Sequence, residues 1–279
     1  MMQRFRTAFP LACLSFVLGW LFASMPATAA PPDAAEVIQR MKDALEPSRP
    51  STRKVVFLVK GPQGEETQWV AGKAFKPLAD GKRTLIVILE PEDLKGTALL
   101  IGERAGEADA KWLYMPPLPR VRKIIPVNAD EHFLNTDFTY ADLGFVSRRG
   151  AYRFLGEEER AGVRAYKIEE VPHEQWYYSR ILTWIAVDSM LPLQRDSYDR
   201  AGVLWKTEVF ENVTVIDGVP TPLVMRMQDK QAGTSTELRV SEVRYDVDIP
   251  DEFFAPERLS QAAASPLWQG YGSRVAGRH

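Results

Sequence analysis

The sequence predicts a mainly β protein in which one helix precedes a long antiparallel sheet that curls toward a barrel. Apolar residues recur at helical spacing only near the start of the chain, over residues 34–45. About a dozen later segments alternate apolar with polar residues. Their connections, such as Asp217-Gly218, have the chemistry of hairpin turns. A sheet built from many hairpins removes its exposed edges best by curling.

The first element is an amphipathic helix. Asp33 is expected as its N-cap, and Pro47 and Pro50 end it. Its apolar face is formed by Ala34, Val37, Ile38, Met41 and Leu45. Strands are then expected over residues 54–60, 65–75, 83–90, 97–102, 111–115, 151–155, 163–171, 178–188, 192–198, 203–215, 222–229 and 234–247.

Four local features depart from a simple succession of half-buried strands. A proline-rich crossing interrupts it at residues 116–126, and a short helical turn with Asp137 as N-cap is expected over 137–143. The strand at 83–90 is apolar on both faces, so a second element must cover it, most simply the N-terminal helix. A change of phase in the last strand predicts a β-bulge near Ser241-Glu242.

The N-terminal segment, residues 1–29, is expected to be a cleaved signal peptide. Arg4 and Arg6 precede an apolar run over residues 8–23, and Ala27-Thr28-Ala29 supplies the cleavage motif. The alternative is an uncleaved anchor, but the apolar run is marginal for a bilayer span. The single cysteine, Cys13, lies inside the run, so the exported protein should be neither lipidated nor disulfide-bonded.

The remaining chain is expected to form one domain over residues 30–259, followed by a flexible tail over residues 260–279. The full chain of 279 residues contains 35 basic and 37 acidic residues, which gives a net charge of −2. This balance excludes the strongly basic face of most nucleic-acid-binding proteins. A hydrophobic content of 45% also excludes collagen-like and disordered chains.

No constellation of catalytic or metal-ligating residues is evident. His132, His173 and His279 are far apart in the sequence, and no nucleophile elbow, phosphate loop or dinucleotide motif occurs. We therefore expect no catalytic residue, metal or cofactor. Abundant carboxylates leave open a hydrolase that uses an acid pair, although the sequence nominates no pair.

The aromatic and aliphatic residues spread over the strands favour a cavity for acyl chains, since burial of apolar surface needs no specific geometry. A well-filled β core is the simpler interpretation of any one of them. From alternation alone, which a slip of one residue would invert, the lining is expected to comprise Trp69, Phe75, Val87, Leu89, Leu99, Ile101, Tyr114, Trp205, Val209, Met225 and Met227. Lys206 and Glu208 then belong to the opposite face.

The crossing at residues 116–126 carries Arg120, Arg122 and Lys123 among its prolines. One interpretation is a stiff, solvated connection. The other is a cationic rim at the mouth of a cavity that contacts phosphate or an anionic partner.

Several motifs in order resemble the outer-membrane lipoprotein-sorting family, the LolA-like proteins, in its broader branch. They extend from about residue 35 to 259 and include Asp93-Leu94-Lys95-Gly96-Thr97, Trp112-Leu113-Tyr114-Met115-Pro116, Arg120-Val121-Arg122-Lys123-Ile124, Asp137-Phe138-Thr139-Tyr140-Ala141-Asp142-Leu143, Tyr178-Ser179-Arg180, Leu191-Pro192-Leu193 and Pro250-Asp251-Glu252-Phe253-Phe254-Ala255-Pro256. The resemblance implies an incomplete antiparallel β-barrel, here of about eleven strands, covered by the N-terminal helix and short helical segments. It also implies an apolar cavity that holds acyl chains, and it supplies no catalytic residues.

Three functional hypotheses follow from the residues and the resemblance. The first is a non-enzymatic periplasmic carrier, in a Gram-negative bacterium, of lipid or acylated lipoprotein cargo, with transient membrane contact. The second is an adaptor with a solid core that serves an envelope exporter of the resistance-nodulation-division type. The third is the carboxylate hydrolase.

Overall fold

The computed structural model describes residues 31–104, 109–125, 131–140, 142–143, 150–172 and 177–272. The expected signal peptide, His173 and the final residues 273–279 lie outside these ranges. The described elements are α1 (Ala34–Leu45), β1 (Ser51–Lys60), β2 (Glu66–Leu78), β3 (Gly81–Glu90), β4 (Ala98–Glu103), β5 (Ala110–Met115), β6 (Leu118–Ile124), β7 (Gly150–Arg160), β8 (Val163–Pro172), β9 (Arg180–Ala186), β10 (Pro192–Tyr198), β11 (Leu204–Ile216), β12 (Val219–Asp229), β13 (Thr234–Tyr245) and the 3₁₀ helices η2 (Asp251–Phe254), η3 (Pro256–Ala264) and η4 (Pro266–Trp268).

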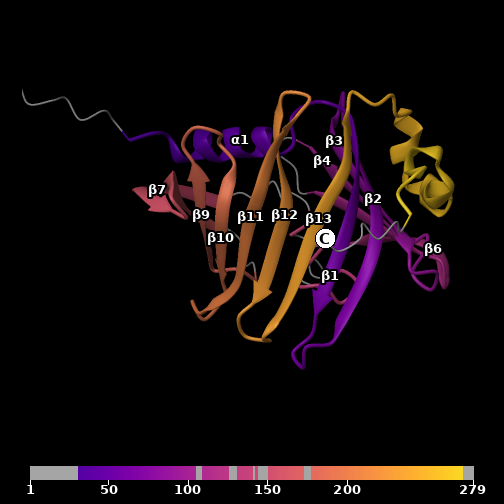
Figure 1. Ribbon diagram of the computed structural model, residues 1–279, viewed down its shortest axis with the longest axis horizontal. Coiled ribbons are helices and arrows are strands. Elements are labelled where there is room, and N and C mark those ends of the chain that lie inside the picture. Colours follow the sequence, from indigo (N-terminus) through magenta and orange to yellow (C-terminus); the bar gives the residue numbers. More distant parts are fainter. Residues whose placement is uncertain are drawn as a thin grey trace, which may run out of the picture. The chain divides into compact units, whose positions relative to one another are not determined.

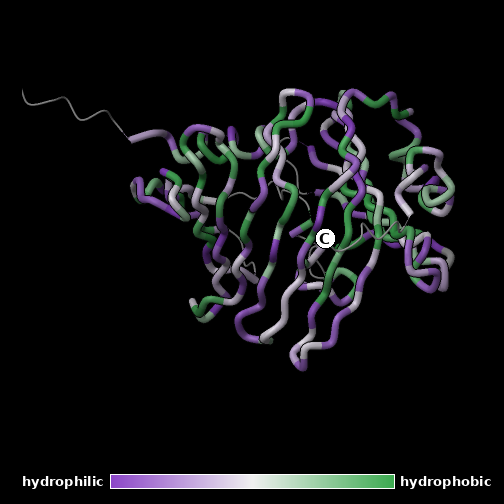
Figure 2. The backbone as a smooth tube through the Cα atoms, viewed as in Figure 1, coloured by the Kyte–Doolittle hydropathy of each residue, from purple (hydrophilic) through white to green (hydrophobic). Residues whose placement is uncertain are grey.

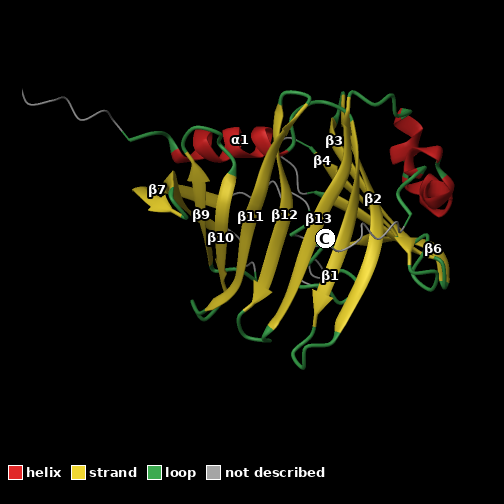
Figure 3. Ribbon diagram, in the orientation of Figure 1, coloured by secondary structure: helices red, strands yellow, loops and turns green. Residues whose placement is uncertain are grey.

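The thirteen described strands form one antiparallel sheet (Figures 1 and 3). Their order is β6-β5-β4-β3-β2-β1-β13-β12-β11-β10-β9-β8-β7, so β1 pairs with β13 and the sheet does not close. The prediction of a mainly β, incomplete antiparallel barrel is confirmed, with thirteen described strands where the resemblance implied about eleven. Hydrophilic residues gather at the turns that join β1 to β2 and β12 to β13 (Figure 2).

Helix α1 forms where the sequence predicts it. The Asp33 side chain accepts a hydrogen bond from the backbone N–H of Ala35, which caps the first turn. The buried face of the helix contacts Ile168 on β8 and Ile185 on β9. The helix therefore packs against β7 to β9 and β12. The expectation that it covers the second face of β3 is wrong.

The predicted bulge is present in β13. The register with β1 shifts between the pairs Thr52–Arg244 and Lys54–Ser241, so β13 carries one extra residue there. Glu242 has a φ of 51° inside this irregularity.

The outer face of β3 to β5 is covered by the C-terminal 3₁₀ helices instead of by α1. Leu259, Trp268 and Tyr271 are buried against this face. Trp268 lies so close to β2 that a Cβ on Gly72 would come within 2.3 Å of its ring. The prediction of a flexible tail from residue 260 is therefore wrong for residues 260–272, whose apolar side chains complete the second core.

The proline-rich segment also differs from the prediction. It forms a hairpin with β5, because Pro116 and Pro117 occupy the turn and Leu118–Ile124 pair with β5. β6 is consequently an edge strand of the sheet. Within the described residues, no helix has the length and apolar character needed to cross a membrane.

Candidate functional site: an internal segment over the inner face of the sheet

The order of the strands determines where the site lies. β6 and β7 follow one another in the sequence but form the two opposite edges of the sheet. The connection between them therefore has to span the width of the sheet. Its described residues, 131–140 and 142–143, pack on the inner face of the sheet, and we call them the plug segment.

The plug segment begins with a tight hairpin. His132 and Thr139 form a bridge, and the backbone N–H of Phe133 donates to the carbonyl oxygen of Phe138 at 2.8 Å. Leu134 and Asn135 at the tip both have positive φ, of 47° and 60°. Positive φ at both central residues is the geometry of a type I′ turn.

A single turn follows the hairpin, and its cap is Thr139 instead of the predicted Asp137. The Thr139 backbone N–H and hydroxyl both donate to the Asp142 carboxylate, while the Asp142 N–H donates to the Thr139 hydroxyl. This reciprocal arrangement is a capping box. Asp137 is free for another role because it lies before the turn.

Aromatic side chains hold the plug segment in the inner core. Phe133, Phe138 and Tyr140 are buried there. The Phe133 ring lies 6.2 Å from that of Phe57 on β1 and 5.9 Å from that of Tyr140. The segment thus occupies apolar surface that the sheet would otherwise expose.

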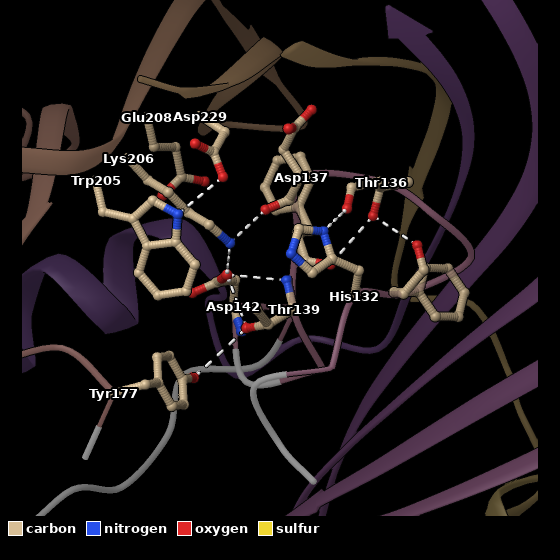
Figure 4. Close-up of polar contacts among 12 residues, drawn as sticks. His132, Thr136, Asp137, Thr139, Asp142, Tyr177, Trp205, Lys206, Glu208 and Asp229 are labelled. Carbon is tan, nitrogen blue, oxygen red and sulfur yellow. Dashed lines mark hydrogen bonds and ion pairs between the residues drawn. The ribbon is translucent and has the colours of Figure 1, made fainter. Parts of the chain in front are cut away.

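Buried polar contacts anchor the plug segment to β11 and β13 (Figure 4). The Lys206 ammonium donates to the backbone carbonyl oxygen of Asp137 at 2.7 Å and lies 3.4 Å from the Asp142 carboxylate. The Asp137 carboxylate accepts hydrogen bonds from the hydroxyls of Thr234 and Thr236. Each buried charge therefore has partners, which limits the cost of its burial.

Beside the plug segment lies a cavity of about 110 Å³. This volume is below the roughly 150 Å³ of an apolar cavity that admits benzene. Its apolar lining is formed by Leu45, Val55, Phe57, Ile86, Phe138, Leu143, Phe210, Pro222, Met225, Leu238 and Val240. As it stands, the cavity has no room for an acyl chain.

The residues expected to line the cavity are all apolar or aromatic, whereas the observed lining also contains ionisable groups: Glu46, Arg53, Lys73, Asp142, Arg195 and Glu208. Burial alone would raise the pKa of Glu46, but the Lys73 ammonium 2.5 Å away outweighs it and holds that pKa below its usual value. Burial raises the pKa of Glu208 to about 7, although Arg195 lies 3.4 Å away.

The described residues contain no group of three or more histidine, cysteine or acidic side chains that could hold a metal ion. Asp142 and Glu208 both line the cavity. The Asp142 carboxylate, however, accepts hydrogen bonds from Thr139 and Tyr178 as well as pairing with Lys206. Its contacts are those of a structural anchor.

Comparisons with known proteins agree with this architecture. A family described only as an uncharacterized protein matches residues 80–261. A putative outer membrane lipoprotein-sorting protein domain from Vibrio parahaemolyticus is 27% identical, with a TM-score of 0.75 over 81% of this chain and 98% of that one. The chain belongs to the family of the model that matches residues 80–261, and its fold is that of the LolA-like proteins. No curated protein matches its sequence.

Two further structures resemble this LolA-like protein. A DUF1329 family protein from Desulfovibrio piger is 27% identical, with a TM-score of 0.74 over 81% of this chain and 97% of that one. A LolA superfamily protein from Nitrosomonas europaea shares the fold at 20% identity, with a TM-score of 0.66 over 81% and 98% of the two chains.

Six of the eleven residues predicted to line the cavity lie on the inner face of this LolA-like sheet. Trp69, Leu99, Ile101 and Met227 belong to the inner core, and Phe75 shares their face because it pairs with Thr84, which in turn pairs with Ile101. Among the eleven, Met225 alone lines the cavity.

The other five residues were wrongly placed. Val87, Leu89 and Tyr114 pack outward against the C-terminal 3₁₀ helices. Val209 pairs with Arg226, away from the cavity lining. Trp205 packs near Tyr177 and Tyr178, and its indole N–H donates to Asp229 at 2.8 Å. Sequence reasoning missed the plug aromatics and the charged lining.

The three basic residues predicted to form a cavity rim lie on the edge strand β6. Arg120, Arg122 and Lys123 are exposed there, and Arg122 lies 3.6 Å from Glu131 of the plug segment. The neighbouring apolar side chains Leu118 and Ile125 are 61% and 52% exposed.

Proposed function

We propose that this LolA-like protein is a non-enzymatic periplasmic carrier that shelters the acyl chains of a lipid or lipoprotein on the inner face of its sheet. The observation that supports the proposal is the plug segment. A separate stretch of chain covers an apolar face at the centre of an open sheet. When that stretch is displaced, acyl chains can take its place.

Displacement is necessary because ligand pockets usually occupy at least about 300 Å³, whereas the cavity measures about 110 Å³. Acyl chains would first enter beside Met225 and Leu238 and then replace Phe133 and Phe138. Loading thus exchanges one set of apolar contacts for another, which keeps the change in free energy small.

Export of the carrier would depend on the leader, residues 1–29. We propose cleavage after Ala29, which leaves a soluble domain without a lipid anchor. N-terminal sequencing of the protein recovered from the periplasm of a Gram-negative host tests this directly. An intact leader in the recovered protein would overturn the proposed cleavage.

The carrier function is tested by native mass spectrometry of the exported protein, with identification of any extracted lipid. We expect a bound acyl compound in the wild-type protein and its loss in Met225→Glu, which places a charge in the cavity lining. Val209→Glu on the neighbouring strand is the matched control, because Val209 is also half-buried but does not line the cavity. Circular dichroism verifies that both variants fold.

A wild-type protein that carries no ligand and takes up none from vesicles would contradict the carrier function. The adaptor hypothesis would then be favoured, with a solid core and partner contact through the exposed cations of β6. In that case exporter binding should weaken with added salt and with Arg120→Gln.

A further inference from the structure

One cation in the cavity lining has no acidic partner. Lys73 pairs with Glu46 at 2.5 Å, and Arg195 lies 3.4 Å from Glu208. Arg53, the third cation of the lining, forms no ion pair with a carboxylate in the described part of the chain. Glu46 interacts with Arg53 only at longer range, so the guanidinium at this end of the cavity lacks a direct acidic partner among the residues described.

The Arg53 side chain is also incompletely hydrogen-bonded. The residue is only 8% exposed, and one Nη donates to the Ser51 hydroxyl at 3.1 Å. Its Nε has no hydrogen-bond partner among the residues described. A buried guanidinium with an unused donor is costly unless an acceptor binds to it.

The neighbouring strand increases this excess of positive charge. Arg53 on β1 pairs directly opposite Lys73 on β2, so two like charges face the same end of the cavity. Cross-strand pairs of like charge are destabilising. Glu46 forms an ion pair with Lys73 and interacts with Arg53 only at longer range, so one carboxylate serves two cations.

The apolar part of the cavity continues from Arg53 along the same strand. Arg53, Val55 and Phe57 alternate onto the inner face of β1 and all line the cavity. At about 3.3 Å per residue, they extend over roughly 13 Å. Leu238 and Val240 on β13 pair with Phe57 and Val55 and widen this apolar surface.

We propose that the ligand of this cavity is a single-chain amphiphile with one anionic head, a carboxylate or a phosphate monoester. The Arg53 guanidinium binds the head, and the chain lies along Val55 and Phe57 toward the plug segment. This inference rests on the proposed carrier function and specifies the chemistry of its cargo. The guanidinium fork suits both heads, since each offers two oxygens.

The test compares dodecyl compounds that differ only in their heads, below their critical micelle concentrations. Binding of laurate, dodecyl phosphate, dodecanol and dodecyltrimethylammonium to the exported protein is measured by calorimetry. We expect the two anions to bind at least tenfold more tightly than dodecanol, and the cation to bind least. A charge-assisted hydrogen bond supports a difference of this size. The tighter of the two anions identifies the head.

Arg53→Gln should reduce the affinity for laurate to that for dodecanol and leave the affinity for dodecanol unchanged. Arg53→Lys, which keeps the charge, should retain part of the preference. Arg239→Gln removes an exposed arginine of β13, and it serves as the matched control. The comparison of heads on the wild-type protein needs no variant, so a variant that fails to fold leaves the test intact.

The outcomes separate this inference from the proposed function. Equal binding of laurate and dodecanol, unaffected by Arg53→Gln, would overturn the anionic head and leave an acyl carrier. Failure of all four compounds to bind would overturn the carrier function itself.

Discussion

The ammonium group of Lys206 on β11 donates a 2.7 Å hydrogen bond to the backbone carbonyl oxygen of Asp137 in the plug segment. The two residues are 69 positions apart in the sequence. Lys206 is fully buried, and the same ammonium pairs with Asp142. One lysine therefore binds both Asp137, which lies before the single turn, and Asp142 within the turn, and so fixes the segment to the sheet (Figure 4).

Lys206→Met should loosen the plug segment and destabilise the protein by about 3 kcal/mol, because it leaves the buried Asp142 carboxylate without its cation. Hydrogen exchange should accelerate in peptides covering residues 131–140 more than in those of β1. Lys230→Met, which removes an exposed lysine, is the control. Equal protection of the plug segment in wild type and Lys206→Met would show that the lysine does not hold it.

A disulfide between the plug segment and β13 should block loading. The Thr236 hydroxyl donates to the Asp137 carboxylate at 2.6 Å, so the two side chains are in direct contact and are the pair chosen for a cross-link. The oxidised double variant Asp137→Cys/Thr236→Cys should lose uptake of acyl compounds, and reduction should restore it. The two single-cysteine variants control for the lost hydrogen bonds. Uptake by the oxidised double variant would contradict displacement of the plug segment.

The sequence predicted the secondary-structure elements better than it predicted which side of the sheet each side chain occupies. Asp33 and the apolar periodicity after it define α1, and the change of phase near Ser241 identifies the bulge, because both signals are local. Alternation failed in β3 and β5, where Val87 and Tyr114 could face either side. Both faces of these strands are apolar, and only the C-terminal 3₁₀ helices decide which one is outer.

The candidate site was harder to predict because it violates the rule that charges face water. In β11, alternation placed Lys206 and Glu208 on the solvent side, whereas both are buried on the inner face. Their burial depends on partners such as Asp137 that lie far away in the sequence. Pairing over such distances leaves no periodic pattern in the chain.

Gly72→Ala should detach the C-terminal 3₁₀ helices, because the new Cβ would lie 2.3 Å from the Trp268 ring. We expect a loss of about 1–3 kcal/mol of stability, as for overpacked cores, and faster tryptic cleavage after Arg258. Gly102→Ala is the matched control, since its Cβ would meet Trp112 at an ordinary 3.4 Å. Resistance to trypsin equal to that of wild type would show that Trp268 can adjust in place.

Stability should decrease as the pH rises from about 5 to 8. The pKa of Glu208 is raised from 4.5 to about 7 in the folded protein, chiefly by burial. In this range the folded state holds a proton that the unfolded state has lost, so raising the pH favours unfolding. The difference between the two pKa values corresponds to a contribution of about 3 kcal/mol to the free energy of unfolding. This contribution is fully present below pH 4.5 and is lost above pH 7.

Glu208→Gln should remove this part of the pH dependence, because glutamine resembles the protonated acid at every pH. Denaturant unfolding at pH 5 and pH 8 measures the effect. Burial also raises the pKa of Glu103, to about 8. Glu103 is present in both proteins, so the difference between their pH profiles reports on Glu208 alone. The variant should match wild type at pH 5 and exceed its stability at pH 8. Parallel pH profiles for the two proteins would mean that Glu208 is ionised in the fold and that Arg195 compensates it fully.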